Sequence, residues 1–263
     1  MEMSEVWRGT WVIAYRELLR FVSERSRLIG SFLQPLLFLV IFGAGFGNVI
    51  GALAPGVNFI QFMYPGIIAM GVLTTSLFAG ISVVADREFG FLREVLVAPI
   101  ARSGIVLGKA VGAAAVALLQ ALVMLVIAPI VGVRLDVGIV LGLVPIVIVL
   151  SIALSGLGIL IASFMRSQQG FQLLIQLLIF PMIFLAGIFF PINQAPDWLK
   201  ILSKVNPMTY GVDAIRQVFL GSSPALGVEL FGHVMSVGEE VVFAAIIGAV
   251  LLAGAVAAFS RQE

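Results

Sequence analysis

Residues 28–85 read LIGSFLQPLLFLVIFGAGFGNVIGALAPGVNFIQFMYPGIIAMGVLTTSLFAGISVVA, and none of these 58 side chains is charged. A helix needs about 20 apolar residues to cross the hydrocarbon core of a bilayer, so the run is long enough for two spans. The turn-forming segment Gly51–Asn58 interrupts it near the middle. We therefore predict two membrane-spanning helices here, near residues 28–50 and 60–85.

The composition of the whole chain is that of a polytopic membrane protein. Of 263 residues, 61% are hydrophobic and 11% are charged, whereas soluble domains have about 25% charged residues. The mean hydropathy is +1.16. We expect a single all-α transmembrane domain over residues 1–263 with six spanning helices. Four further apolar runs supply the remaining spans, near residues 109–132, 137–163, 170–191 and 240–260.

Charge and cysteine content exclude several classes of function. The net charge of +1 gives no general attraction to nucleic acid. The absence of cysteine excludes disulfides, thiolate metal sites and cysteine nucleophiles. The first residues contain charged side chains and no early apolar region, so we do not expect a cleaved signal peptide.

The distribution of basic residues predicts the orientation in the membrane. Six spans place both termini on one side, and eleven of the 15 Lys and Arg residues fall on that side. Cytoplasmic segments carry the excess of Lys and Arg in membrane proteins. We therefore predict a multi-pass protein of the cytoplasmic, or inner, membrane with both termini in the cytoplasm.

Residues 5–25 have the pattern of an amphipathic helix at the membrane surface. One face carries apolar side chains and another carries charges, which suits the headgroup boundary of a bilayer. A plain membrane anchor and a helix that contacts a partner need the same pattern, so both interpretations remain open. The apolar face comprises Trp7, Trp11, Ala14, Leu18 and Val22, and the charged face comprises Arg16, Arg20 and Glu24.

The longest segment predicted outside the membrane is residues 192–239, on the side opposite to the two termini. We call it the external segment. Pro196 and Asp197 can begin one short helix, and Asn206 can cap a second that stops at Gly221. Both stretches are too apolar for a solvated loop. We expect them to be re-entrant helices that dip back into the outer leaflet, buried in protein or lining a cavity.

Motifs for nucleotide binding and ion coupling are not found. Gly104–Lys109 is one residue shorter than a phosphate-binding loop, and alanine follows it where Ser or Thr is needed. The predicted spans carry ionisable groups only at their ends, at Lys109 and Glu240. This pattern excludes a proton relay, an intramembrane metal cluster and a hydrolytic acid–base pair, so we do not expect an enzyme.

Uncharged polar side chains inside the spans have two interpretations. Thr75, Gln172 and Gln176 could line a substrate path. They could equally form hydrogen bonds between helices, which are worth about 0.6–2 kcal/mol each. The structural interpretation is the more common one for such residues.

A mixed charged and apolar segment, residues 86–100, follows the second span. Leu92, Val95 and Leu96 form one apolar face, and charged side chains surround it. A short amphipathic helix of this kind can lie inertly on the bilayer or insert into a groove on a soluble partner. The two aromatic residues and the mixed charges favour a protein groove.

Four pieces of the chain together resemble a known family. They are Gln34–Phe38, Tyr64–Ile67, Asp86–Ile100 with Gly108-Lys109 after it, and Phe189–Ile192 with Asn206–Tyr210. In order and spacing they are similar to the membrane subunits of ABC-2 type exporters, which include bacterial drug, lipid and polysaccharide permeases. The third piece is the most specific of the four.

The resemblance implies a complex of two permeases, either identical or homologous, with two cytoplasmic ABC ATPases. ATP and Mg would bind to the ATPase subunits, and this chain would bind no cofactor. The surface helix at residues 5–25 would also touch the ATPase. The coupling helix would include Glu88, Gly90, Phe91, Leu92, Arg93 and Leu96, and the external gate would include Pro191, Asn206, Pro207 and Tyr210.

From sequence we expect the permease subunit of an ATP-driven exporter for an amphipathic drug, lipid or lipid-linked glycan. The alternative is a membrane assembly or signalling subunit that docks a cytoplasmic ATPase without transporting anything. A passive channel is a third interpretation, but it would need a polar pore that the sequence scarcely offers.

Overall fold

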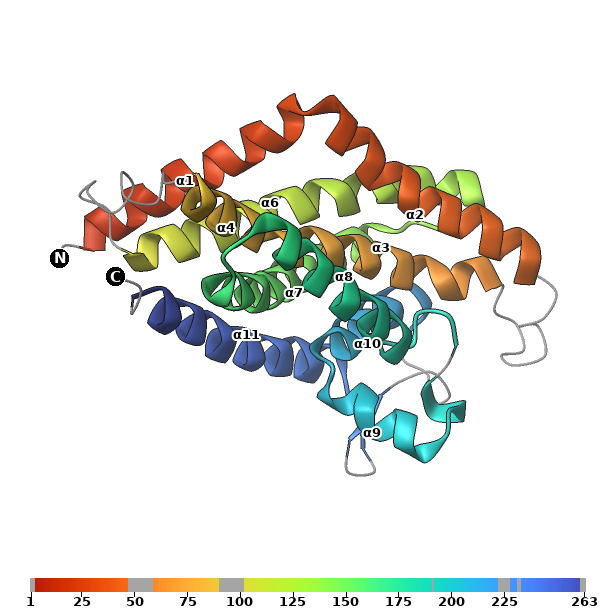
Figure 1. Cartoon of the computed structure of the whole chain (residues 1–263). Helices are drawn as coiled ribbons and strands as arrows, with labels where there is room; N and C mark the ends of the chain where they lie inside the picture. Colours follow the sequence, from red (N-terminus) through yellow and green to blue (C-terminus); the bar gives the residue numbers. More distant parts are fainter. Residues whose placement is uncertain are drawn as a thin grey trace.

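Long apolar helices dominate the computed structural model (Figure 1), which describes residues 3–46, 59–89, 102–190, 192–221, 228–230 and 233–260. The α-helices are α1 (Met3–Ser23), α2 (Arg25–Phe46), α3 (Phe59–Leu77), α4 (Ile81–Glu88), α6 (Arg102–Ile127), α7 (Val137–Phe164), α8 (Gln168–Leu185), α9 (Asp197–Val205), α10 (Pro207–Leu220) and α11 (Val237–Ser260). Three short 3₁₀ helices are η2 (Phe78–Gly80), η3 (Ala128–Val131) and η4 (Ile192–Gln194). The strands β1 (Glu229–Leu230) and β2 (His233–Val234) form one antiparallel pair.

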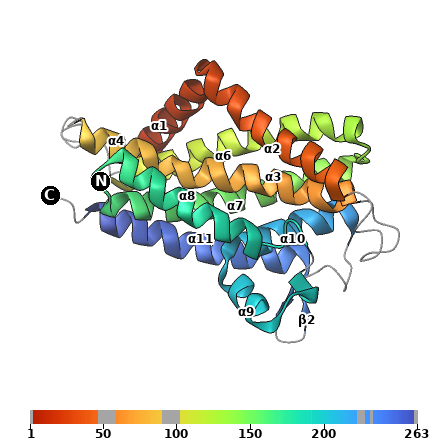
Figure 2. The same cartoon turned by 45° about the vertical axis from the view of Figure 1, so that its right-hand side comes forward.

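The long helices α3, α6, α7, α8 and α11 run roughly along one direction, so the bundle has two ends (Figures 1 and 2). At the end that we call the terminal end, α1 begins, α4 ends, α6 begins and α11 finishes (Figures 1 and 2). At the opposite end, called the far end, α2 finishes, α3 begins and α10 packs against the bundle (Figure 2). Segments distant in sequence therefore meet at each end.

The long apolar helices agree with the all-α, polytopic prediction. Among the described residues, five stretches are long and apolar enough to cross a membrane: Phe59–Glu88, Ser103–Val131, Val137–Phe164, Gln168–Leu185 and Val237–Phe259. Val6–Ser23 and Leu28–Gly43 form a sixth only as a pair, bent by 71°. The first of the five combines α3, η2 and α4.

Helix α1 packs lengthwise against α6, a contact that the sequence interpretation missed. Glycines at four-residue spacing on α6 allow the two backbones to approach closely. A Cβ on Gly108 would come within 2.7 Å of the Ile13 Cβ, and one on Gly112 within 2.9 Å of the Glu17 Cβ. Trp7 and Trp11 are exposed, whereas Ala14, which the amphipathic pattern placed on the same face, is buried against α6.

The core is centred on α3, which contacts α2, α6, α7 and α10. Tyr64 is fully buried, and its hydroxyl donates a hydrogen bond to the Met124 carbonyl on α6. Where η2 crosses α7, Gly80 and Gly158 bring the two backbones into contact. A methyl group on either glycine would overlap a backbone carbonyl of the facing segment.

We expect Gly158→Ala to destabilise the protein by about 1–3 kcal/mol, the usual cost of forcing extra volume into a packed core. The added methyl would displace the backbone at Leu77. Gly71→Ala in α3 is the matched control, because a Cβ there meets nothing within 4 Å. Thermal unfolding of the purified variants measures both effects. Equal unfolding temperatures for the two variants would contradict the crossing.

Candidate functional site

The end of α4 is held tightly against the junction between α7 and α8. The Arg87 guanidinium donates hydrogen bonds to the carbonyls of Ser163, at 3.1 Å, and Met165, at 2.6 Å. The Glu88 carboxylate accepts a hydrogen bond of 3.0 Å from the backbone N–H of Gln168, where α8 begins. The chain therefore leaves α4 from a point fixed to two other helices.

The predicted coupling helix at residues 86–100 is described only in its first part. Asp86 to Glu88 continue the spanning helix as the last residues of α4, and Phe89 follows in a turn. The coupling helix was predicted to begin at Asp86, but no new helix begins there, because Asp86 lies within α4. The other predicted coupling residues, Gly90, Phe91, Leu92, Arg93 and Leu96, lie outside the described residues.

A buried ionic cluster lies next to the last turns of α4 and comprises Lys109, Ser82, Asp86 and Glu17. The Lys109 side chain is 3% exposed, and its Nζ lies 2.6 Å from Ser82 Oγ, 3.3 Å from Asp86 Oδ2 and 3.8 Å from Glu17 Oε1. One lysine on α6 thus joins α1 and α4. The sequence placed Lys109 at the end of a span and did not predict its burial.

The length of the spans explains how this cluster is tolerated. The span Ser103–Val131 has 29 residues, which is about 43 Å of helix, whereas the hydrocarbon core is about 30 Å thick. Lys109 lies within two turns of the start of α6. The helix is therefore about 13 Å longer than the hydrocarbon core is thick, which is enough length to keep Lys109 outside the hydrocarbon.

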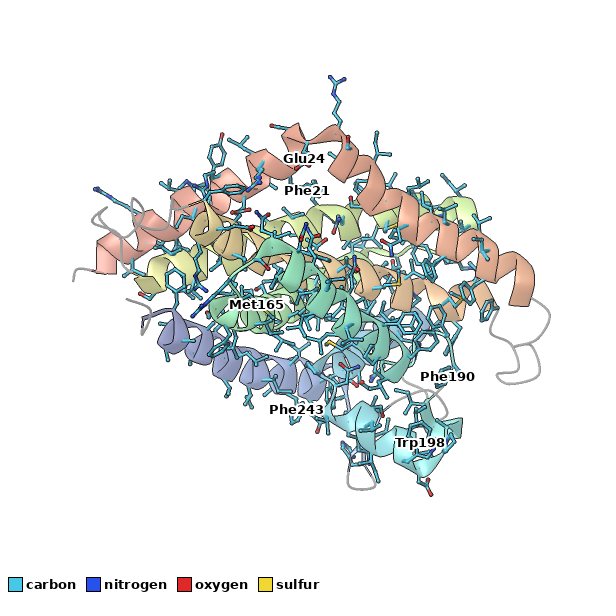
Figure 3. The ribbon with its side chains drawn as sticks, viewed as in Figure 1. Phe21, Glu24, Met165, Phe190, Trp198 and Phe243 are labelled. Atoms are coloured by element: carbon cyan, nitrogen blue, oxygen red, sulfur yellow. The ribbon has the colours of Figure 1, made fainter. Side chains whose placement is uncertain are left out.

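A polar cavity of about 420 Å³ lies between α1, α2, the α3–α4 span, α6 and α8. Two of the three residues predicted for a substrate path, Thr75 and Gln172, line it, whereas Gln176 does not. Thr75 also donates a hydrogen bond of 2.6 Å to Gln120 Oε1 on α6. Thr75 is therefore both a cavity wall and a link between helices. Figure 3 labels Phe21 and Glu24 at the bend from α1 to α2; both line the cavity.

At the far end, Asn206 and Tyr210, two residues predicted for the external gate, form hydrogen bonds that hold α10 in position. Asn206 caps α10, because its Oδ1 accepts a hydrogen bond from the Met208 N–H, and its Nδ2 donates to the Met182 carbonyl on α8. The Tyr210 hydroxyl donates to the Lys204 carbonyl, at 2.7 Å. Pro207 is the first residue of α10, as predicted. Pro191 lies outside the described residues.

The external segment also contains a buried polar cluster that the sequence interpretation did not find. Arg216 donates a hydrogen bond of 2.7 Å to the Gly187 carbonyl and lies 4.1 Å over the Phe62 ring. Burial lowers the pKa of Arg216 to about 10, and Asp213 and Glu240 oppose the shift. The guanidinium is therefore still charged at neutral pH.

The remaining members of this cluster join α10 to α11 and to the residues before it. Gln217 Nε2 donates to the Met235 carbonyl at 2.9 Å and lies 3.2 Å from Glu240 Oε2. Asp213 Oδ2 accepts a hydrogen bond of 2.6 Å from the Val228 N–H. The i, i+3, i+4 spacing of Asp213, Arg216 and Gln217 on one helix was the signal available in the sequence.

Comparison with known proteins places these features in a wider context. The family model described as ABC-2 type transporter matches residues 8–220. "Putative transport permease ycf38" of Cyanophora paradoxa is 30% identical over 227 residues, 84% of this chain and 77% of that protein. Nodulation protein J of Rhizobium meliloti (strain 1021) is 28% identical over 219 residues, which are 82% of this chain and 80% of that protein. "Probable multidrug ABC transporter permease YbhR" of Escherichia coli (strain K12) is 32% identical over 177 residues, 63% of this chain and 45% of that protein.

Proposed function

Because the chain belongs to the ABC-2 type transporter family, we propose that it is the permease subunit of an ATP-driven exporter for an amphipathic molecule. The permeases of this family are not themselves catalytic, since the ATPase is a separate subunit. ATP and Mg therefore belong to the partner. In this proposal two permeases and two ABC ATPases form the working complex.

The observation that carries the proposal is the way α4 ends. Arg87 and Glu88 attach its last turn to α7 and α8, and Lys109 attaches Asp86 to α1 and α6. A force applied to the following segment, residues 90–101, would reach four other helices through these contacts. Such a connection is what a subunit needs if it is moved by an ATPase outside the membrane.

The distribution of basic residues supports the orientation. Eleven of the 15 Lys and Arg residues fall in the segments that the sequence places on the side of both termini, so this side faces the cytoplasm by the positive-inside rule. Both termini and the ATPase-docking segment then lie in the cytoplasm, and the external segment with α9 and α10 faces outward. The membrane is the cytoplasmic membrane.

The polar cavity favours a transporter over an assembly or signalling subunit. A non-transporting subunit needs the docking segment but has no use for a 420 Å³ cavity lined by Thr75 and Gln172 within the spans. Pockets of roughly 300–1,000 Å³ are the usual size for small-molecule sites. The test is to co-purify the permease with its ABC ATPase and to measure ATP hydrolysis in proteoliposomes with a panel of amphipathic compounds.

We expect Gln172→Leu to weaken this substrate stimulation and Gln176→Leu to leave it unchanged. Only Gln172 lines the cavity, although the two residues are one turn apart on α8 and the chemical change is the same. Loss of one hydrogen bond of about 1 kcal/mol raises the half-maximal substrate concentration roughly fivefold. Identical stimulation curves for both variants would show that Gln172 has only a structural role.

A further inference from the structure

Two carboxyl groups meet in the buried polar cluster between α10 and α11. Asp213 of α10 is 2% exposed, and Glu240, in the first turn of α11, is fully buried. Their side chains are within hydrogen-bonding distance of each other. Both also contact one amide, since Gln217 Nε2 lies 3.3 Å from Asp213 Oδ2 and 3.2 Å from Glu240 Oε2. Two ionised carboxylates have no hydrogen to share, so a hydrogen bond between them requires a proton.

The hydrogen-bond donors around the pair are too few for two carboxylates. Gln217 Nε2 has two hydrogens, but it lies near three acceptors, of which the third is the Met235 carbonyl at 2.9 Å. The Val228 N–H supplies one more donor, to Asp213 Oδ2. Among the described residues, Asp213 Oδ1 and Glu240 Oε1 are buried without a hydrogen-bond partner. One proton bound by the pair would supply the donor that these oxygens lack.

One proton also balances the charge of the cluster. Arg216 attracts both carboxyl groups, but within the described part of the chain its hydrogen bond goes to the Gly187 carbonyl and not to either of them. Two carboxylates and one guanidinium leave a net charge of −1. An uncompensated charge in a buried site is costly, whereas a proton on the pair makes the cluster neutral.

The other titratable groups of α10 and α11 do not change this balance. On α10, the Tyr210 hydroxyl donates its hydrogen bond to the Lys204 carbonyl. On α11, Glu239 is exposed and contacts His233 at 3.3 Å. Residues 221–228, which follow α10, contain no titratable side chain. Neither helix therefore brings a second cation to the pair.

The helices packed around α10 and α11 add no charge either. Helices α7 and α8 contain no titratable residue, and α6 carries its charged residues near its start, at the terminal end. Tyr64 of α3 donates its hydroxyl hydrogen to the Met124 carbonyl. On α9, the charged side chains reach the surface, at Asp197, Lys200 and Lys204. The pair is therefore isolated from any group that could replace the proton.

A metal ion is a poorer solution than a proton. It would have only the two carboxylates as charged ligands, and it would be repelled by the Arg216 guanidinium. The described residues contain no group of three or more His, Cys, Asp or Glu side chains that could hold a metal ion. The proton is therefore the cation that this cluster accommodates.

We propose that Asp213 and Glu240 bind one proton between them and that this proton holds α10 to the start of α11. Its loss would leave two adjacent carboxylates against one guanidinium, and their repulsion would separate the two helices. Because Pro207 and Tyr210 of the predicted external gate lie on α10, the proton fixes the position of the gate. The site is not a proton path, since α7 and α8 have no titratable residue to pass the proton on. The inference does not depend on the proposed transport.

Infrared spectroscopy of the purified full-length protein, without the ATPase and in a detergent that has no carbonyl group, tests the proton directly. A neutral carboxylic acid has a C=O band that a carboxylate lacks, and the band shifts in D₂O. We expect this band at neutral pH and its reversible loss at alkaline pH. Glu240→Gln and Asp213→Asn should each abolish it, because the remaining carboxylate then balances Arg216.

Glu239→Gln is the matched control for the infrared test. It is the same change at the adjacent, exposed position, where glutamine can also complete the capping box with Ser236. This variant should keep the band. Absence of the band from the unmodified protein, or its survival in both Glu240→Gln and Asp213→Asn, would overturn the proposal.

Cysteine labelling tests whether loss of the proton frees α10. Ala214 is buried and lines the tight space between α7, α10 and α11 together with Glu240. Because the chain has no cysteine, Ala214→Cys introduces a single buried thiol for a water-soluble maleimide. Opening that releases one proton becomes about tenfold more favourable for each pH unit. The labelling rate, divided by the rate with Glu240→Gln added, should therefore rise about tenfold per pH unit.

The division by the Glu240→Gln rate removes the ionisation of the thiol itself. If Ala214→Cys does not fold, Ala244→Cys places a thiol on the α11 side of the same space. A ratio that does not change with pH would show that α10 stays in place without the proton. Protection of the thiol by Na⁺ at constant pH, with no carboxylic acid band, would assign the pair to a metal ion. Either result would overturn the proposal.

Discussion

Leu92→Asp is expected to abolish co-purification of the ABC ATPase while the permease still inserts into the membrane. The apolar face of residues 86–100 would fill a groove on the ATPase, and a buried unpaired carboxylate there costs several kcal/mol. We expect insertion to be unaffected, because Arg87 and Glu88 hold the described end of α4 to α7 and α8. The effect on assembly should therefore far exceed any effect on folding.

Co-expression of both subunits, with a tag on the permease, measures this effect directly. The matched control is Leu202→Asp on α9, which is the same change at an exposed position of the external segment. The control should retain the ATPase. An intact complex with Leu92→Asp would show that the segment after α4 is not the docking site.

Replacement of Lys109 by methionine is expected to cost about 3–5 kcal/mol of stability, because Asp86 loses its cation and Glu17 keeps only the exposed Arg16, at 4.0 Å. The same change should loosen α1 from α4, since no other described ion pair links either helix to α6. Thermal unfolding measures the first effect. Limited proteolysis near the bend between α1 and α2 measures the second.

Two further variants test whether charge pairing is the cause. Lys200→Met removes a lysine from an exposed pair with Asp197, and such surface pairs contribute about 0–1 kcal/mol. The triple change Lys109→Met, Asp86→Asn and Glu17→Gln removes the uncompensated charges and should recover much of the loss. If Lys109→Met unfolds at the same temperature as Lys200→Met, the cluster does not hold the terminal end together.

The local features of the fold could be predicted from the sequence. Uncharged stretches predicted the five unbroken spans to within a few residues, except at the start of Ser103–Val131 and the end of Gln168–Leu185. Asn206 was identified as the cap of α10, which begins at Pro207 and ends at Leu220. Each of these depends on residues close in the chain, where composition and capping chemistry act directly.

The features that were missed depend on contacts between distant segments. The glycines at residues 104 and 108 of α6 were considered only as an incomplete phosphate-binding loop, and their close contact with α1 was not predicted. Asp213 accepts a hydrogen bond from the Val228 N–H, and Gln217 donates one to Glu240. The buried polar cluster on α10 therefore forms only after α10 and α11 have packed together. The cavity likewise needs five segments in place before Gln172 and Gln176 acquire different surroundings.

The most direct test of the permease assignment is vectorial transport in proteoliposomes that contain this chain and its ABC ATPase. A fluorescent amphipathic substrate is followed across the bilayer with ATP outside, where inverted complexes expose their nucleotide sites. We expect movement that requires ATP hydrolysis, stops with Leu92→Asp and persists with Leu202→Asp. A complex that hydrolyses ATP but moves none of a panel of drugs, lipids and glycolipids would instead identify a non-transporting membrane subunit.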